Sequence, residues 1–298
     1  MRVDPNYISN LSAALDQSSN VEAALTNQLS SGLRITSLQD DPVAAAQNSM
    51  ISSAIAKDDT FVRTASGQTS FMQVADSTLG EVVSQLTSAV SLAVQAGNGT
   101  NNEANLAAIA QQLTGIRDQV LSLANTTYLG QSIFAGSQGA TPPFTLDTST
   151  TPATVTYTGD SNLRYVETPS GQKIQTNLIG PDVFGTGSSG VFGALNQLIA
   201  DFSGPTAAAS SVADAGALST ALAQVSAQRS LLDGSLSRMQ ATSTYAQTEE
   251  AQLKVQQSAL ISADPVSIAT SLKSAETQRQ ALMSVMSAIG KNNLFDYL

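Results

Sequence analysis

The chain has 298 residues, a net charge of −10, and no cysteine, histidine or tryptophan. Without cysteine there is no disulfide or thiolate metal ligand, and without histidine there is no Ser-His or Cys-His nucleophile pair. The negative charge argues against nucleic acid or an anionic membrane as a partner. A chain without cysteine fits either a cytosolic protein or an exported one that is stabilised by assembly.

The N-terminal stretch has the spacing of a weak amphipathic helix. Its apolar positions include Ile8, Leu11, Leu15, Leu25 and Leu29. A helix with so little apolar surface is marginal in water, and Ser30-Ser31-Gly32 ends it. The first residues lack the apolar run of a cleaved signal peptide, and no segment is long and apolar enough to span a bilayer. We therefore expect that any export avoids the general secretory route.

A long second helix is predicted from Asp41-Pro42, with the aspartate as N-cap and the proline at the first helical position. Its apolar residues repeat every 3.5 positions, which indicates a helix that buries one stripe against other helices. The predicted core positions of this stripe are Ile55, Val62, Met72, Leu79 and Leu86, and Val83 and Val90 continue the half-register of Val62. After a polar turn at 97–102, a third helix is predicted from about Leu106 to Leu123.

The composition changes between residues 130 and 190, where the heptad repeat stops and glycine, proline and threonine become frequent. Residues 153–158 alternate with period two, and residues 163–178 predict a hairpin around Thr168-Pro-Ser-Gly171. This β-rich insert is too small for much core of its own. A short helix is predicted at 191–202, followed by a loop or loose helix start.

The stretch from about 218 to 260 has apolar residues at a strict period of 3.5 and predicts a long helix that pairs with the second one. Its predicted core positions include Leu218, Val225, Leu232, Met239, Leu253 and Leu260. The polar members of the stripe are Arg229, Ser243, Glu250 and Gln257. They either flank a wide bundle stripe or fix its register and partner choice.

The C-terminal region repeats the Asp-Pro helix start at Asp264-Pro265. Its apolar positions include Leu272, Leu282, Met286 and Ile289, and Leu294 and Phe295 follow in the tail. A terminus with exposed apolar residues is usually held by something. The two ends of the chain therefore mirror each other, and each is predicted to be a marginal amphipathic helix that flanks a long bundle helix.

These elements predict a mainly α fold: an elongated antiparallel coiled-coil bundle of the N- and C-terminal regions, with a small central β-rich insert. The predicted division has three parts. They are a terminal coiled coil (1–40 and 264–298), a long helical bundle (41–129 and 191–263) and the insert (130–190).

Motifs that resemble catalytic or cofactor sites lack the context that such sites need. Gly185-Thr-Gly-Ser-Ser-Gly190 matches the dinucleotide pattern, but a heptad helix follows it, so we interpret it as a flexible connector. Ser170-Gly-Gln-Lys173 falls in the predicted hairpin turn rather than at a helix start in a cleft. We expect no enzyme, no cofactor and no metal site.

Both ends of the chain carry the signature of a known family. Residues 29–36 and 40–46, with 264–272 and 278–282 at the other end, resemble bacterial flagellins and their hook-associated relatives. Within that family, residues 130–136, residues 180–184 and the Asn-Leu-Phe-Asp-Tyr-Leu end look more like the hook–filament junction proteins than filament flagellin. Pro42 is a small departure from flagellin at its position.

The resemblance implies a structural protein that is exported unfolded through the flagellar type III channel and assembles outside the cell. Its terminal helices would pair as an inner coiled coil, the long helices would form the next domain, and the insert would point outward. As a ring or helical layer of identical subunits, it would join the hook-proximal junction protein to flagellin, with an export chaperone on its C-terminal region beforehand. The alternative is a filament-forming flagellin.

Assembly of this kind fits the weak terminal helices, because neighbouring subunits would offset the loss of entropy when these helices become ordered. A head-to-tail interface that does not close on itself builds a helical layer. Arg34 either pairs across subunits or is an exposed loop arginine.

Overall fold

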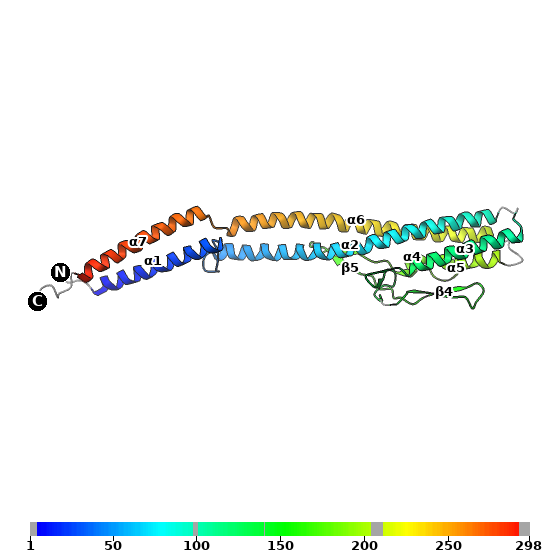
Figure 1. The fold of residues 1–298 in the computed structure, drawn as a ribbon, viewed down its shortest axis with the longest axis horizontal. Helices are drawn as coiled ribbons and strands as arrows, with labels where there is room; N and C mark the ends of the chain where they lie inside the picture. The colour runs from blue at the N-terminus through cyan, green and yellow to red at the C-terminus, as the bar shows by residue number, and fades with distance from the viewer. Residues whose placement is uncertain (1–4, 98–100, 140, 204–210, 292–298) are drawn as a thin grey trace. The chain divides into compact units, whose positions relative to one another are not determined.

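A computed structural model of the chain describes residues 5–97, 101–139, 141–203 and 211–291. Long helices occupy both ends of the sequence and small antiparallel strand pairs lie in the middle, which confirms the mainly α fold class with a β-rich insert (Figure 1). The chain forms two compact units, Met1–Lys57 with Glu249–Leu298 and Asp58–Thr248. The three-part division expected from the sequence stays a prediction.

The bounds of the helices are α1 Pro5–Ser31, α2 Pro42–Ala96, α3 Glu103–Ala124, α4 Gly180–Phe184, α5 Val191–Phe202, α6 Ser211–Ile261 and α7 Pro265–Lys291. Two of the helices, α2 and α7, begin where the capping residues predict, and α6 begins earlier than the predicted start near 218. Asp41 Oδ1 accepts the amide of Ala44 at 3.0 Å, and Asp264 Oδ1 accepts the amide of Val266 at 3.0 Å. Both Asp-Pro starts are therefore confirmed as helix N-caps. None of the described helices is long and apolar enough to cross a membrane.

The core of the larger unit lies between α2, α3, α5 and α6, and α2 runs antiparallel to α6 there (Figure 1). The heptad positions that it buries completely or nearly so are Met72, Leu79 and Leu86 on α2 and Leu218, Val225 and Leu232 on α6, while Met239 is buried in a second, smaller cluster with Phe61 and Ala65. The second half-register of α2 is shifted by one residue, because Val62, Val83 and Val90 are half-buried while Val82 and Ala89 are buried. A helix that contacts several neighbours needs a stripe wider than a two-helix seam.

The insert contains three antiparallel strand pairs. They are β1 Thr127–Tyr128 with β2 Gln131–Ser132, β3 Phe144–Asp147 with β4 Thr154–Tyr157, and β5 Tyr165–Glu167 with β6 Lys173–Gln175. The pairing of Glu167 with Lys173 confirms the predicted hairpin. Between β1 and β2, Leu129 (φ 50°) and Gly130 (φ 78°) both have left-handed backbones, as a two-residue hairpin turn requires.

An aromatic cluster joins the insert to the helices. The ring of Phe184 lies 5.3 Å from that of Phe134, 5.2 Å from that of Phe144 and 5.6 Å from that of Phe192. All four rings belong to the same core as the buried faces of α2, α3 and α6. The insert is thus stabilised by the helical core, as its small size suggested. Its short helix α4, which the sequence did not predict, places Phe184 in the cluster.

Two carboxyl groups meet where α5 ends and α6 begins. Burial, followed by the neighbouring carboxyl of Asp201, raises the pKa of Asp214 to about 6. Asp201 is itself held by the amide of Gln197, whose Nε2 lies 3.1 Å from Oδ1. The folded chain therefore binds a proton at Asp214 more tightly than the unfolded chain does.

Replacing this carboxyl should stabilise the protein at neutral pH. The ionised carboxyl destabilises the fold fully above the folded pKa of about 6 and not at all below the unfolded value of 3.8. We expect Asp214→Asn to raise the free energy of unfolding by about 1 kcal/mol at pH 7, after allowance for solvent screening, with the gain fading as the pH falls to 4. Urea denaturation across this range measures it. The exposed Glu81→Gln is the control, and a gain that is the same at pH 4 and pH 7 contradicts the prediction.

Candidate assembly surface

The terminal helices α1 and α7 lie side by side within the smaller unit (Figure 1). Among the described side chains of α7, the buried apolar ones are Ile268 and Ala275, each 7% exposed. Among those of α1, the only buried one belongs to Ser18, and its Oγ has no hydrogen-bond partner in the described part of the chain. Glu22 and Arg279 form an ion pair of 2.9 Å across the two helices. The described part of the pair therefore lacks a continuous apolar core.

The predicted assembly residues on α1 and α7 whose side chains the structure describes are all incompletely buried. Leu11, Leu15, Leu25, Leu272, Leu282 and Met286 are half-buried. Ile8 and Leu29 are 47% and 42% exposed. The side chain of Ile289, and Leu294 and Phe295, lie outside the described residues.

Further apolar side chains lie on the outer surface of the pair. Val21 on α1 and Met283 and Val285 on α7 are 45%, 49% and 40% exposed. Single exposed apolar residues need no explanation, but a helix pair with this many has more apolar surface than two helices can bury against each other. The exposed apolar residues Ile8, Val21, Leu29, Met283 and Val285 are called the terminal apolar surface below.

The segment between α1 and α2, residues 32–41, is fixed to the turn between α6 and α7. Leu33 and Ser262 form an antiparallel bridge. The amide of Arg34 donates to the carbonyl of Ile261 at 2.7 Å, and the amide of Ala263 donates to that of Gly32 at 2.9 Å. Gly32 has a φ of 70°, a conformation that favours glycine, so the segment leaves α1 through a left-handed residue.

Arg34 has partners within its own chain. Its Nη2 donates to the carbonyl of Leu260 at 3.2 Å, and its Nη1 lies 3.5 Å from Asp41 Oδ2. The side chain is still 50% exposed. Pairing of Arg34 across subunits therefore stays a prediction that this exposure permits.

Asp40 organises the same segment. Its Oδ2 accepts the amide of Thr36 at 2.8 Å, the hydroxyl of Thr36 at 3.0 Å and the amide of Ser37 at 2.7 Å. These bonds, with the amide of Thr36 as the largest cause, hold the pKa of Asp40 below its usual value.

Removing this carboxylate should loosen the segment without unfolding the helices. We expect Asp40→Ala to increase amide exchange at Thr36 and Ser37 several-fold, since both amides lose their acceptor. The same bonds should persist above pH 4 and weaken as the pH falls through the depressed folded pKa. Hydrogen exchange at fixed pH measures the first effect. Asp40→Asn keeps an acceptor oxygen and should exchange less, and equal exchange in both variants contradicts the role given to Asp40.

Two of the four polar stripe residues of α6 bond directly to α2. Arg229 Nε and Asp76 Oδ1 are 2.6 Å apart, and Gln257 Nε2 donates to Asn48 Oδ1 at 2.9 Å and to Ser52 Oγ at 2.7 Å. Glu250 instead pairs with Lys254 of its own helix at 2.6 Å, and Ser243 is half-buried. Nearby in the stripe, Ile55, Leu253 and Leu260 are half-buried. The bonds of Arg229 and Gln257 favour the register-fixing alternative for these two residues.

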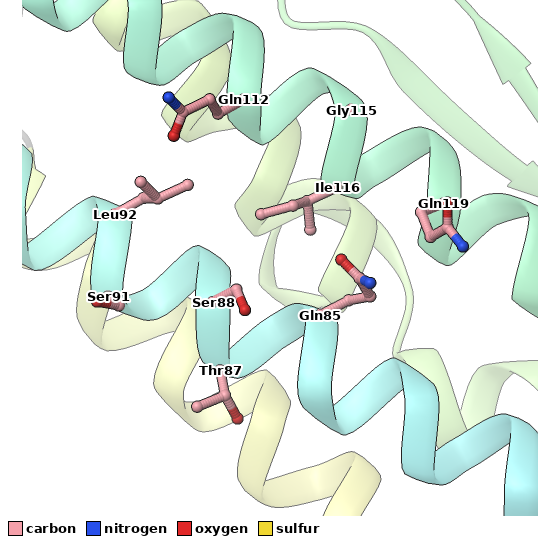
Figure 2. A pocket seen from close by; sticks show the side chains of 9 residues that line it. All are labelled: Gln85, Thr87, Ser88, Ser91, Leu92, Gln112, Gly115, Ile116 and Gln119. Atoms are coloured by element: carbon pink, nitrogen blue, oxygen red, sulfur yellow. The ribbon is translucent and has the colours of Figure 1, made fainter.

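A second surface, on the larger unit, is an open groove of about 680 Å³ between α2 and α3 (Figure 2). Leu92 and Ile116 extend toward each other across it, and Gln85, Gln112 and Gln119 also line it. None of the described residues that line it is charged.

Two models of one protein family match this chain. The family model of the bacterial flagellin N-terminal helical region matches residues 6–139, and that of the bacterial flagellin C-terminal helical region matches residues 215–298. These ranges contain α2, α3 and nearly all of α1 at one end, and α7 with nearly all of α6 at the other.

Individual relatives agree with these matches. Flagellar hook-associated protein 3 of Salmonella typhimurium is 37% identical over 121 residues, which are 40% of this chain and 38% of that protein. Polar flagellin F of Vibrio parahaemolyticus is 31% identical over 103 residues, 35% of this chain and 27% of that protein. The matches thus span less than two fifths of the length of these curated relatives.

A solved structure extends the similarity at the level of the fold. It is that of a Vibrio parahaemolyticus protein assigned as flagellar hook-associated, with a TM-score of 0.57 and 18% identity over 75% of this chain and 97% of that one. Because the two family models together match both helical ends and well over half of the sequence, the chain belongs to the bacterial flagellin family.

Proposed function

We propose that this chain is a structural component of the bacterial flagellum that forms the layer joining a hook-associated protein to the flagellin filament. The observation that carries the proposal is the terminal pair, where α1 has a serine as its only buried described side chain and leaves apolar residues exposed. Such a pair gains its missing apolar contacts from neighbouring subunits. The hook-associated relative at 37% identity supports a junction role over a filament role.

In this mechanism, identical subunits assemble through their terminal helices. Neighbouring copies cover the terminal apolar surface, and a contact that does not close on itself repeats into a ring or helical layer. The exposed part of the Arg34 guanidinium then donates to a carboxylate or carbonyl oxygen of the next subunit. The insert, whose core is shared with the long helices, stays folded while the subunits assemble.

The proposed partners follow from this position in the flagellum. They are further copies of the chain, the hook-proximal junction protein on one side and flagellin on the other. Before assembly, an export chaperone covers the C-terminal region and the chain passes unfolded through the flagellar type III channel. The site of action is therefore extracellular, and the proposed role is structural rather than enzymatic, without nucleic acid or membrane as partner.

A charge on the terminal apolar surface should prevent assembly. In a strain that lacks this chain, we expect Leu29→Asp to reduce the fraction of hooks that carry filaments at least tenfold, because the aspartate would be desolvated in the subunit contact. Electron microscopy of cells and swimming assays measure the result. Asn27→Asp adds the same charge two residues away, at an exposed polar position of α1, and should leave filaments unchanged.

Other outcomes distinguish the alternatives. If Leu29→Asp supports normal filaments, the terminal apolar surface is not the assembly contact. If the purified wild-type chain alone grows into long filaments, it is a filament flagellin instead of a junction protein. In the isolated chain, amide exchange should be fast in α1 and α7 and slow in the core segments of α2 and α6.

A further inference from the structure

The sulfur atoms of the chain differ widely in their access to solvent. The chain has no cysteine, so its six methionines are its only sulfur-containing residues. Met72 and Met239 are 0% exposed, whereas Met283 on α7 is 49% exposed and Met50 on α2 is 73% exposed. A small oxidant dissolved in the solvent therefore reaches Met283 and Met50 but not the two methionines of the core.

Met283 differs in its chemistry from the other members of the terminal apolar surface. Ile8, Val21, Leu29 and Val285 have hydrocarbon side chains, which peroxides leave unchanged, while the thioether of Met283 is readily oxidised to a sulfoxide. Met283 is thus the one residue of these five whose polarity a mild oxidant changes.

Met283 lies close to the edge of the α1–α7 pair. Arg279, four residues earlier on α7, contacts Glu22 of α1 at 2.9 Å and has a side chain that is 38% exposed. Residues four positions apart share one side of a helix, so Met283 lies one turn farther along this edge. A neighbouring subunit that covers the terminal apolar surface therefore also encloses the sulfur of Met283.

We propose that Met283 is a site of oxidation by peroxides, and that its sulfoxide prevents the chain from joining the assembly. The inference rests on the subunit contact proposed above. With hydrogen peroxide, the sulfur donates an electron pair to one peroxide oxygen, the O–O bond breaks, an S–O bond forms and water is released. The thioether is oxidised by two electrons and the peroxide is reduced by two.

The sulfoxide changes the free energy of burial in the subunit contact. Its oxygen is a strongly polar hydrogen-bond acceptor, and burying an acceptor without a donor is unfavourable, whereas burying the thioether is favourable. Because assembly covers this side chain, oxidation acts on subunits that have not yet been incorporated. Oxidised subunits are therefore excluded before they enter the layer.

Peroxide treatment of the purified full-length chain tests the proposal. Peptide mass spectrometry should detect sulfoxide at Met283 and Met50 at least about tenfold sooner than at Met72 and Met239. The treated chain is then added, together with flagellin, to cells of a strain that lacks this chain and whose hooks carry no filaments. Electron microscopy should show about tenfold fewer filaments than with the untreated chain.

Substitutions assign the effect to one sulfur, with each variant compared with its own untreated sample. Met50→Leu removes the most exposed of the described methionines, and Met286→Leu removes a half-buried one from α7. Both should remain sensitive to peroxide. Met283→Leu has no sulfur at this position, so peroxide should leave its number of filaments unchanged. Met283→Gln introduces a polar group of similar length and should lower the number of filaments about tenfold without any oxidant.

The outcomes separate this inference from the proposed function. If the untreated wild-type chain restores no filaments, the proposed function is refuted, and this inference with it. If the untreated chain restores them, three results would refute the oxidation site alone. They are equal numbers of filaments from a chain whose Met283 is fully oxidised, undiminished peroxide sensitivity of Met283→Leu, and normal filaments with Met283→Gln.

Discussion

Phe184→Ala should lower the free energy of unfolding of the larger unit by about 3–5 kcal/mol. The ring is 1% exposed and contacts the rings of Phe134, Phe144 and Phe192 at centroid distances of 5.2 to 5.6 Å. Its removal leaves a cavity and ends three aromatic contacts at once. Because the insert depends on this cluster, its amides should lose exchange protection before those of the helices.

Urea unfolding followed by circular dichroism, with hydrogen exchange for the insert, measures this effect. Tyr165→Ala is the matched control, because Tyr165 is an aromatic residue of the same insert that is 52% exposed. It should change the free energy of unfolding by less than about 1 kcal/mol. A loss for Phe184→Ala no larger than that of the control would mean that the insert has a core of its own.

Arg229→Met should lower the free energy of unfolding by about 2 kcal/mol. Arg229 binds Asp76 through two contacts, Nε to Oδ1 at 2.6 Å and Nη2 to Oδ2 at 3.2 Å. Methionine keeps part of the apolar stem but leaves the carboxyls of Asp76 and Asp233 without the intervening cation. Burial, and then the charge of Asp76, already raises the pKa of Asp233, so the ionised carboxyl of Asp76 opposes the ionisation of Asp233.

The pH dependence of this loss follows from the pKa of Asp76, which the hydrogen bond of Arg229 lowers. A depressed pKa contributes stability above the unfolded value of 3.8 that is lost as the pH falls through the folded value. The difference between wild type and Arg229→Met should therefore be full at pH 7 and shrink below pH 4.

A double-mutant cycle with Asp76→Asn isolates the pair, and its coupling should be at least about 1 kcal/mol. Arg63→Met is the matched control, since Arg63 pairs only with Asp59 one turn away in the described structure, at 2.6 Å, and is 72% exposed. It should change stability by less than about 0.5 kcal/mol. Equal losses of unfolding free energy for the two arginine variants would show that the Arg229–Asp76 pair between α2 and α6 stabilises the fold no more than an exposed ion pair does.

The helical part of the fold could be predicted from local signals. Asp41 and Asp264 cap their helices as their Asp-Pro sequences indicate, because capping depends on residues only two or three positions apart. The heptads likewise identify Leu79 on α2 and Val225 on α6 as fully buried positions. Periodicity reports which face of a helix is apolar, but not how wide a stripe its neighbours will cover.

The aromatic cluster could not be predicted in the same way. Phe134, Phe144, Phe184 and Phe192 share no spacing, and they come from different elements and loops of the chain. Asn196 looks like an ordinary polar residue of a short helix until tertiary packing buries it. For Arg229, the heptads predict its place in the stripe, but its bond to Asp76 depends on the alignment of two residues 153 positions apart in the sequence.

The bridge between Leu33 and Ser262 has a kinetic consequence for the terminal helices. It holds the C-terminal end of α1 close to the N-terminal end of α7, so their pairing is intramolecular, with an effective concentration in the millimolar range. Thermal separation of the two helices would then be followed by rapid re-pairing in the same register. Exchange of α7 between neighbouring chains would have to compete with this tethered partner, which favours incorporation of each subunit with its own helix pair intact.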